Sequence, residues 1–149
     1  MSLETEIKQS KFKNEYQKLA VNIFYTHGWL VNQHADNLKK YGITTSQYNI
    51  LRILRGQYPN SAPISLLKER MLDKMSDASR LVERLRNKGL LSRELCKEDR
   101  RRVNVLISEK GLDLLLKMEE YEKKSESYLS CISKSEAKEI NRLLDKLRG

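Results

Sequence analysis

The sequence contains few of the residues that bind metals, form disulfides or interrupt helices. Its 149 residues include two cysteines, two histidines and two prolines. Cys96 and Cys131 are far apart and form no CxxC pair. Together with His27 and His34 they do not show the spacing of a structural zinc site. We therefore expect neither a metal nor a cofactor.

Long apolar runs are also absent. No stretch of about 18 apolar residues occurs, so we expect no transmembrane span. The N-terminal stretch MSLETEIKQSKFKNEY lacks the apolar middle of a secretory signal, and we expect a cytoplasmic protein. Phosphate-loop, nucleophile–base and metal motifs are missing too, which makes an enzyme the least favoured function. The chain has 39% hydrophobic and 33% charged residues, a balance that suits one compact domain.

The excess of basic residues is concentrated in the middle of the chain. The formal net charge is +9. Residues 65–104 carry 12 Lys and Arg against 7 Asp and Glu, a net of +5, whereas residues 105–149 carry 9 of each. A basic cluster of this kind favours a polyanionic partner such as a nucleic acid. Solubility conferred by lysines is the alternative explanation for the charge.

Apolar side chains recur every three or four residues in the first part of the chain, which predicts helices at 12–41, 44–56, 64–71 and 77–88. Thr44 and Gln47 have the spacing of a capping box, and Ser65 and Ser76 are the expected N-caps of the third and fourth helices. Gly42 and Gly89 mark helix ends. Residues 56–63, GQYPNSAP, form a loop, and residues 72–76 form a turn.

The hydrophobic period then changes from about 3.6 to 2, which predicts two strands at 90–95 and 102–108 joined by the charged connector CKEDRR. A long helix at 109–132, capped by Ser108, and a last helix capped by Ser133 and Glu136 follow. The last helix carries an apolar stripe of Ile140, Leu143, Leu144 and Leu147. The expected fold is mostly α with a small β-hairpin: a winged helix–turn–helix.

The helix at 77–88 has a composition suited to the DNA major groove. Its inner face is aliphatic, and its outer, N-terminal face is polar and basic. The hairpin tip suits the minor groove, because adjacent arginines repel one another until phosphates neutralise them. We expect Asp99 to pair with Arg101 and fix its direction. The full set expected to contact DNA or to orient such a contact is Ser65, Lys74, Ser76, Ser79, Arg80, Arg84, Lys97, Asp99, Arg100, Arg101 and Arg102.

The segment EDRRRVNVLISEKG resembles the wing signature of MarR-type transcriptional regulators. In that signature Asp-Arg-Arg is followed, at fixed spacing, by a β-branched residue, an aliphatic residue, Ser or Thr, and Gly. The upstream segment SRLVERLRNKGLLSR resembles the recognition helix of the same family, and the resemblance covers nearly the whole chain. The residues that fill the wing signature are Asp99, Arg100, Arg101, Val105, Ile107, Ser108 and Gly111.

The resemblance implies a homodimer built from a single MarR-like domain, residues 1–149. Residues 44–108 would form the winged helix–turn–helix lobe, and residues 1–42 and 109–149 the helical dimerisation region. Two lobes would straddle a pseudo-palindromic operator of double-stranded DNA, with the helix at 77–88 in the major groove and Arg101 in the minor groove. Family members usually repress transcription and release DNA when a small aromatic or phenolic ligand binds.

The ligand cleft implied by the resemblance lies between the dimerisation helices and the winged lobe. Tyr25, Trp29, His34 and Tyr48 are the residues expected to line it, because they lie on the first two long helices. Core and interface packing is the favoured alternative for these aromatic residues. A winged-helix module that binds protein without binding DNA is the alternative function. Cys96 has basic neighbours that could lower the pKa of its thiol, but an inert strand cysteine is the favoured interpretation.

Overall fold

Helices dominate this computed structural model, which describes residues 1–96, 98–99 and 101–149. The small sheet and the helical remainder confirm the predicted fold class. In chain order the elements are α1 (Leu3–Ile7), α2 (Glu15–Leu38), the 3-10 helix η1 (Lys39–Tyr41), α3 (Thr45–Gln57), β1 (Ala62–Pro63), α4 (Ile64–Arg70), α5 (Ala78–Asn87), β2 (Leu91–Leu95), β3 (Val103–Ile107), α6 (Glu109–Lys117), α7 (Glu119–Ser127) and α8 (Lys134–Arg148).

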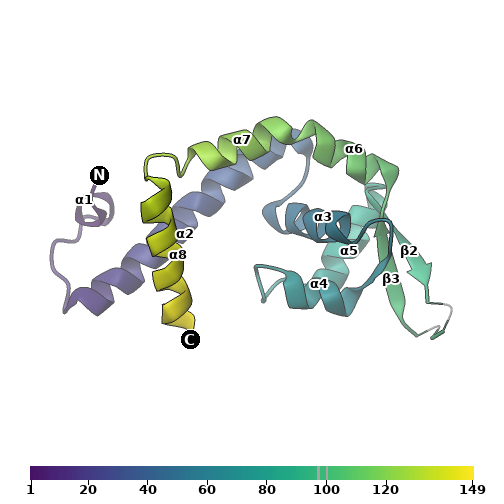
Figure 1. The fold of residues 1–149 in the computed structure, drawn as a ribbon, viewed down its shortest axis with the longest axis horizontal. Helices are drawn as coiled ribbons and strands as arrows, with labels where there is room; N and C mark the ends of the chain where they lie inside the picture. The colour runs from purple at the N-terminus through teal and green to yellow at the C-terminus, as the bar shows by residue number, and fades with distance from the viewer. Residues whose placement is uncertain (97, 100) are drawn as a thin grey trace.

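The elements fall into two parts (Figure 1). One part, which we call the winged lobe, consists of α3, α4, α5 and the three strands, and α6 packs against it. The helical arm consists of α1, α2, α7 and α8, with α7 lying along α2. The chain passes from arm to lobe after η1 and returns through α6.

The core of the molecule lies in the winged lobe. Its centre is formed by side chains of α3, α4, α5 and β3, among which Leu51, Leu67, Val82 and Val105 are fully buried. The sheet has three antiparallel strands in the order β1-β3-β2, and Ala62 of β1 pairs with Val105 of β3. The predicted hairpin is therefore confirmed, but the predicted loop at 56–63 contains a third, two-residue strand.

Most of the predicted helix ends are confirmed. Thr44 and Ser133 form capping boxes with Gln47 and Glu136, and the Ser108 hydroxyl accepts a hydrogen bond from the Gly111 backbone N–H. Gly42 and Gly89, where the predicted helices end, adopt the left-handed backbone with φ of 67° and 71°.

Two predicted N-caps are wrong. The N-cap of α5 is Asp77, whose carboxylate accepts from the Arg80 backbone N–H, while Ser76 lies one residue before the cap. The N-cap position of α4 is Pro63, and Ser65 lies inside the helix. Pro63 ends β1 with an extended backbone that leads directly into the helix, so α4 begins one residue before Ser65.

The long helix predicted at 109–132 is divided at Met118 into α6 and α7. Met118 is fully buried, with φ of −91° and ψ of 12°. On one side of it α6 packs against α3, and on the other side α7 packs against α2. The helix predicted at 12–41 begins three residues later and ends as η1, and a short additional helix, α1, precedes it.

The arm leaves much of its apolar surface exposed. The stripe on α8 faces solvent, with Ile140, Leu143 and Leu147 between 45% and 61% exposed, and α8 has no buried residue. Phe24 and Tyr16 on α2 are also exposed. Among the helices of the described residues, none is both long enough and apolar enough to span a membrane.

Candidate nucleic-acid interface

Packing fixes which face of α5 points outward. Ala78, Val82 and Leu85 are fully buried, and α5 contacts α3 and α4 through this face. Because a helix repeats every 3.6 residues, Ser79, Arg80 and Arg84 then lie on the exposed face. The structure thus brings these three predicted residues together on one surface.

The turn before α5 is held by its own hydrogen bonds. Asp73 accepts from the Ser76 hydroxyl at 2.7 Å and from the Met75 backbone N–H at 3.0 Å. The Ser76 hydroxyl is the main reason that the pKa of the Asp73 carboxyl is lowered. Lys74 donates to the backbone carbonyl of Glu69. Ser76 is consequently half-buried against the turn rather than fully presented on the surface.

Beside this turn lies a hollow of about 280 Å³. Lys68, Lys74, Ser76 and Asp77 are among the residues that line it. Ser65 is exposed on α4, the helix that ends at this turn. Helix α4 and the turn that follows it therefore present hydroxyl and ammonium groups next to the N-terminal end of α5.

The wing differs from the predicted Asp99–Arg101 pairing in one respect. An oxygen of Asp99 accepts from the Arg101 backbone N–H at 2.9 Å, and the other oxygen lies 3.8 Å from Nε of Arg102. A carboxylate that accepts from the backbone N–H two residues later closes a tight turn. Among the described residues, the Arg101 guanidinium forms no ion pair. Asp99 thus orients Arg101 through the main chain. The predictions for Lys97 and Arg100 lie outside the described residues.

An acidic residue that was not predicted as part of the site links α5 to the wing. Glu83 accepts from Arg86 on its own helix at 2.6 Å and forms an ion pair at 3.1 Å with Arg93 of β2. The bond from Arg86 is the main cause of the lowered pKa of the Glu83 carboxyl. The spacing of Glu83 and Arg86 on one helix was a visible signal, but the contact with Arg93 depends on the packing of the strand.

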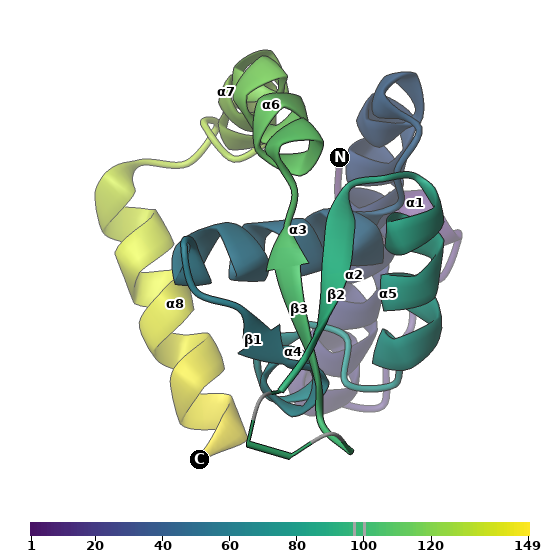
Figure 2. The same cartoon turned by 90° about the vertical axis from the view of Figure 1, so that its right-hand side faces the viewer.

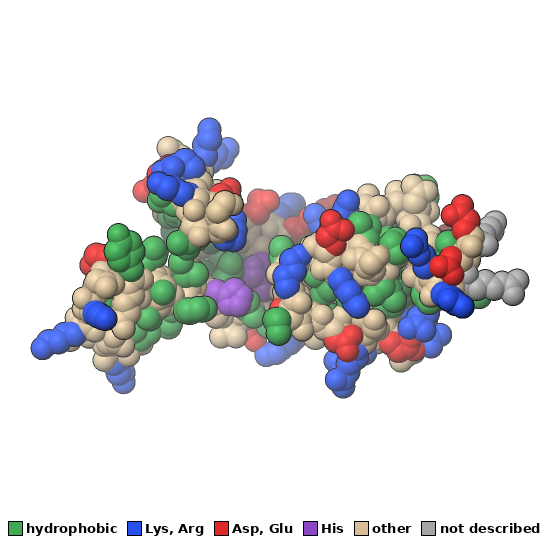
Figure 3. All heavy atoms as spheres, turned by 90° about the horizontal axis from the view of Figure 1, so that it is seen from below, with side chains coloured by type: hydrophobic (Ala, Val, Ile, Leu, Met, Phe, Trp, Pro, Cys, Tyr) green, Lys and Arg blue, Asp and Glu red, His purple; other side chains and the backbone are tan. Residues whose placement is uncertain are grey.

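These features face the same side of the lobe. In Figure 2 the end of β2, the start of β3 and the N-terminal end of α5 all lie toward the lower side of the molecule. Figure 3 views that side and shows Lys and Arg side chains spread over the lobe among acidic ones, with hydrophobic side chains gathered over the arm. Within the described residues Arg80, Arg84 and Arg101 form no ion pair with an acidic side chain.

The four residues expected to line a ligand cleft are only partly brought together. His34 and Tyr48 meet through Tyr121: the His34 Nδ1 lies 2.6 Å from the Tyr121 hydroxyl, and the Tyr48 and Tyr121 rings are 5.1 Å apart, edge to face. Trp29 contacts Tyr128. Tyr25 instead donates to Glu6 of α1 at 2.7 Å. Tyr121 of α7 and Tyr128, the residue that follows α7, link the cluster and were not predicted because they lie far from it in the sequence.

Burial changes the acid–base properties of this aromatic cluster. It lowers the pKa of His34 and raises that of Tyr121, since burial disfavours the charged form of each. Burial is also the main reason that the pKa of Tyr48 rises to about 12. The His34, Tyr48 and Tyr121 side chains are therefore neutral at pH 7.

A hollow of about 640 Å³, larger than the one beside the turn before α5, lies away from this cluster. Its lining includes Tyr41, Lys88, Lys110 and Asp113.

The described residues offer no group of three His, Cys, Asp or Glu side chains that could hold a metal ion. Cys96 is half-buried and Cys131 exposed, and both thiols are free. The candidate site that the described residues form is a polar and basic surface of helix and hairpin.

Comparison with known proteins identifies the family. No family model matches the sequence. The HTH-type transcriptional regulator MgrA of Staphylococcus aureus is 31% identical over 119 residues, which is 78% of this chain and 79% of that protein. A MarR transcription factor of known structure from Planctomyces limnophilus is 26% identical, with a TM-score of 0.69 over 91% of this chain and 98% of that one.

This chain belongs to the MarR family of transcriptional regulators. It is a DNA-binding regulator of transcription with a winged helix–turn–helix.

Two further solved MarR-like structures share the fold. The S. aureus MepR–DNA complex has a TM-score of 0.73 at 21% identity and covers 92% of this chain and 97% of that one. The organohalide-sensing regulator RdhR-CbdbA1625, in its 2,4-dichlorophenol-bound form, has a TM-score of 0.81 at 21% identity and covers 94% of this chain and 85% of that one. At this identity the likeness shows the fold alone.

Proposed function

We propose that this MarR-family protein is a homodimeric repressor that binds a pseudo-palindromic operator and releases it when a small aromatic or phenolic ligand binds. The observation that carries the proposal is that Arg80, Arg84 and Arg101 are exposed while the N-terminal end of α5 and the tip of the hairpin lie at the same side of the lobe (Figure 2). A protein surface that presents a helix and a basic hairpin together matches the two grooves of a duplex.

In the proposed complex α5 enters the major groove. Ser79, Arg80 and Arg84 contact base edges or phosphates, because Arg can pair with guanine and short polar side chains let the backbone approach closely. Ser65, Lys74 and Ser76, which are exposed or half-exposed around the turn, position the helix on the phosphate backbone.

The wing enters the minor groove through Arg101. Its side chain is exposed, and Asp99 fixes its main chain through the bond to the Arg101 N–H. Arg102 is exposed, lies 3.8 Å from Asp99 and directly precedes β3, and we include it among the phosphate contacts. We include Lys97 and Arg100 among the phosphate contacts on the basis of the sequence.

The exposed apolar surface of the arm supports the proposed homodimer. Ile140, Leu143 and Leu147 on α8 share one helix face, and α2 exposes Tyr16 and Phe24. An apolar helix face exposed to water favours association with a second apolar surface. A second copy would supply that surface and place two lobes side by side on the duplex.

The effector site is proposed at the aromatic cluster where α2, α3 and α7 meet. Tyr121 contacts His34 and Tyr48, and Tyr128 contacts Trp29. Tyr25 lies nearer the N-terminal end of α2. A neutral phenol or aromatic ring suits edge-to-face contacts with these side chains. The 2,4-dichlorophenol bound by one structural neighbour supports a ligand of this class.

The direct test of the DNA proposal is the Arg101→Ala variant. It should bind a duplex selected by the wild-type protein from a random-sequence pool about tenfold to a hundredfold more weakly, because one groove contact is lost. Fluorescence anisotropy at several salt concentrations gives the affinity and the number of phosphates neutralised. Lys123→Ala removes the same charge from α7, on the side of the molecule opposite the wing in Figure 1, and should leave both values unchanged.

Equal affinity of Arg101→Ala and wild type for the duplex would refute the placement of the wing in the minor groove.

The effector is tested by adding 2,4-dichlorophenol to the complex of the wild-type protein with the selected duplex. Release of the duplex by the wild type, with a reduced response in Tyr48→Ala, is the expected result. Equal release of the duplex from wild type and from Tyr48→Ala would contradict the proposed pocket.

A further inference from the structure

The junction of lobe and arm is a helix break, and one carboxylate of the following turn reaches across it to the lobe. At Met118 the chain leaves α6, which packs on α3 of the lobe, and enters α7, which packs on α2 of the arm. Neither a proline nor a glycine stiffens or marks this point. A two-part helix of this kind fixes the angle between lobe and arm only if other contacts hold it.

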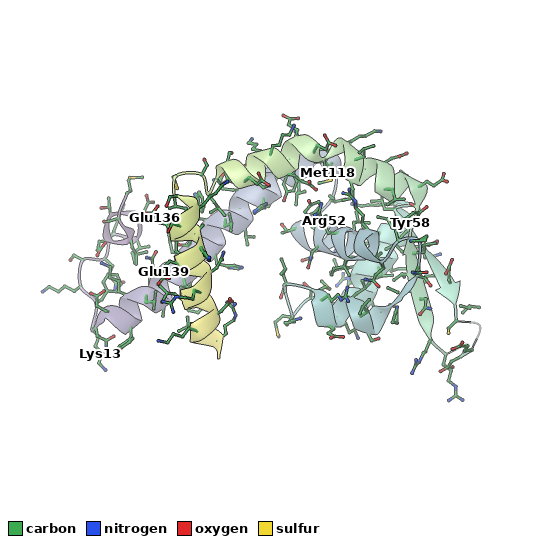
Figure 4. The ribbon with its side chains drawn as sticks, in the orientation of Figure 1. Lys13, Arg52, Tyr58, Met118, Glu136 and Glu139 are labelled. Carbon is green, nitrogen blue, oxygen red and sulfur yellow. The ribbon has the colours of Figure 1, made fainter. Side chains whose placement is uncertain are left out.

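Glu122, one turn after the break, supplies such contacts. The same oxygen of its carboxylate accepts from the guanidinium of Arg52 and, at 3.2 Å, from the hydroxyl of Tyr48. Both donors lie on α3, so one side chain of the arm holds two side chains of the lobe. Figure 4 shows Arg52 on α3 beneath the junction at Met118.

The neighbouring Tyr121 completes the contact from the apolar side. Its side chain is 3% exposed, its ring meets that of Tyr48 edge to face, and its hydroxyl shares a hydrogen bond with His34 of α2. Consecutive residues of α7 therefore engage α3 and α2 at the same place. The Arg52 and Glu122 side chains are 44% and 38% exposed, so the polar contact lies at the rim of this buried ring.

The adjacent ion pair of the arm is a useful contrast. Glu120 pairs with Lys40 at 3.4 Å, and the two side chains are 81% and 52% exposed. Lys40 belongs to η1 rather than to the winged lobe. Glu120 thus carries the same charge as Glu122 on the same helix but does not hold the lobe.

We propose that Glu122 is a positioning residue for DNA binding: with Arg52 and Tyr48 it clamps the winged lobe at one angle to the arm. The inference rests on the proposed homodimer, in which that angle sets the distance between the two α5 helices. Two recognition helices bind one face of a duplex when they are about 34 Å apart. The clamp therefore determines which half-site spacing the protein accepts.

The test uses duplexes with the half-sites selected by the wild-type protein and a spacing changed one base pair at a time. Wild type should show a sharp optimum. Glu122→Gln should bind the optimal duplex about fivefold to tenfold more weakly and lose much of its discrimination between spacings, because the lobe angle is no longer fixed. The exchanged pair Arg52→Glu with Glu122→Arg should restore part of the discrimination. Glu120→Gln is the matched control and should behave as wild type.

A second measurement follows the lobe angle without DNA. Spin labels at exposed Asn60 of the lobe and exposed Asn32 of the arm, in a chain with both native cysteines replaced by serine, report the distance between the two parts. The distribution should be narrow in the wild type and broader in Glu122→Gln. An unchanged distribution and spacing profile would overturn the clamp, as would an equal loss of affinity at every spacing. If wild type retained no duplex while the distributions still differed, the proposed operator binding would fail and the clamp would stand.

Discussion

The winged lobe and the helical arm bury their apolar side chains to very different degrees. In the lobe Ile50, Leu51 and Leu54 of α3 are at most 1% exposed. In the arm the stripe of α8 is about half exposed, and the 24-residue helix α2 buries a single residue, Leu38. Both parts have amphipathic helices, yet only the lobe closes its apolar faces within one chain.

The difference indicates two kinds of stability. The lobe rests on a shared core to which α3, α4, α5 and the sheet contribute, together with Leu115 of α6. The helix α8 is supported within the chain by its capping box and by surface ion pairs such as Arg142–Glu139 and Arg148–Asp145. Such pairs are individually weak, so we expect α8 to depend on an additional surface for its stability.

The largest predicted effect tests the lobe. Leu51→Ala should lower the free energy of unfolding by about 2–5 kcal/mol, because it removes a fully buried side chain and leaves a cavity. Urea denaturation followed by circular dichroism measures this loss. Leu116→Ala on the exposed side of α6 is the control, with an expected change within about 0.5 kcal/mol. Similar losses in both variants would mean that the lobe has no dominant core.

The next effect tests the arm. Leu143→Asp places a charge on the exposed apolar stripe and should weaken self-association by about a hundredfold or more, since the charge would be buried in the dimer. Analytical ultracentrifugation over a range of concentrations measures the dissociation constant. Lys146→Asp on the same helix is a control for added negative charge. A wild-type protein that is monomeric at all concentrations would contradict the proposed role of the stripe.

The smallest effect concerns the junction of the two parts. Burial lowers the pKa of His34, so the unfolded chain binds a proton at higher pH than the folded one. Stability should therefore be independent of this group above about pH 6.5 and fall as the pH drops below that value. Unfolding free energies of wild type and His34→Gln between pH 5 and 8 measure the effect. Identical slopes in the two proteins would show that His34 does not contribute.

Local signals made much of the fold predictable. The Thr44–Gln47 and Ser133–Glu136 caps and the change of hydrophobic period at the hairpin are properties of neighbouring residues, and all are confirmed. β1 escaped prediction because its pairing of Ala62 with Val105 is between distant segments. The break at Met118 escaped because it is imposed by packing against two different partners, without a local breaker.

The candidate site likewise combines features that neighbouring residues predict with contacts between distant segments. The outward position of Ser79, Arg80 and Arg84 follows from the periodicity of the buried residues on α5, which the sequence displays. The contacts of Glu83 with Arg93 and of Glu122 with Arg52 join different elements, and no spacing in the chain reveals them. The role of Asp99 was predicted in outline, but its bond is to the backbone of Arg101 rather than to the guanidinium.

The central claim, that α5 occupies the major groove while the wing occupies the minor groove, is tested most directly by dimethyl sulfate protection of the selected duplex. This reagent methylates guanine N7 in the major groove and adenine N3 in the minor groove. Two stretches of protected guanines are expected about one helical turn apart, flanked by protected adenines that become reactive again in Arg101→Ala. A single protected stretch, or adenine protection that persists in Arg101→Ala, would contradict the claim.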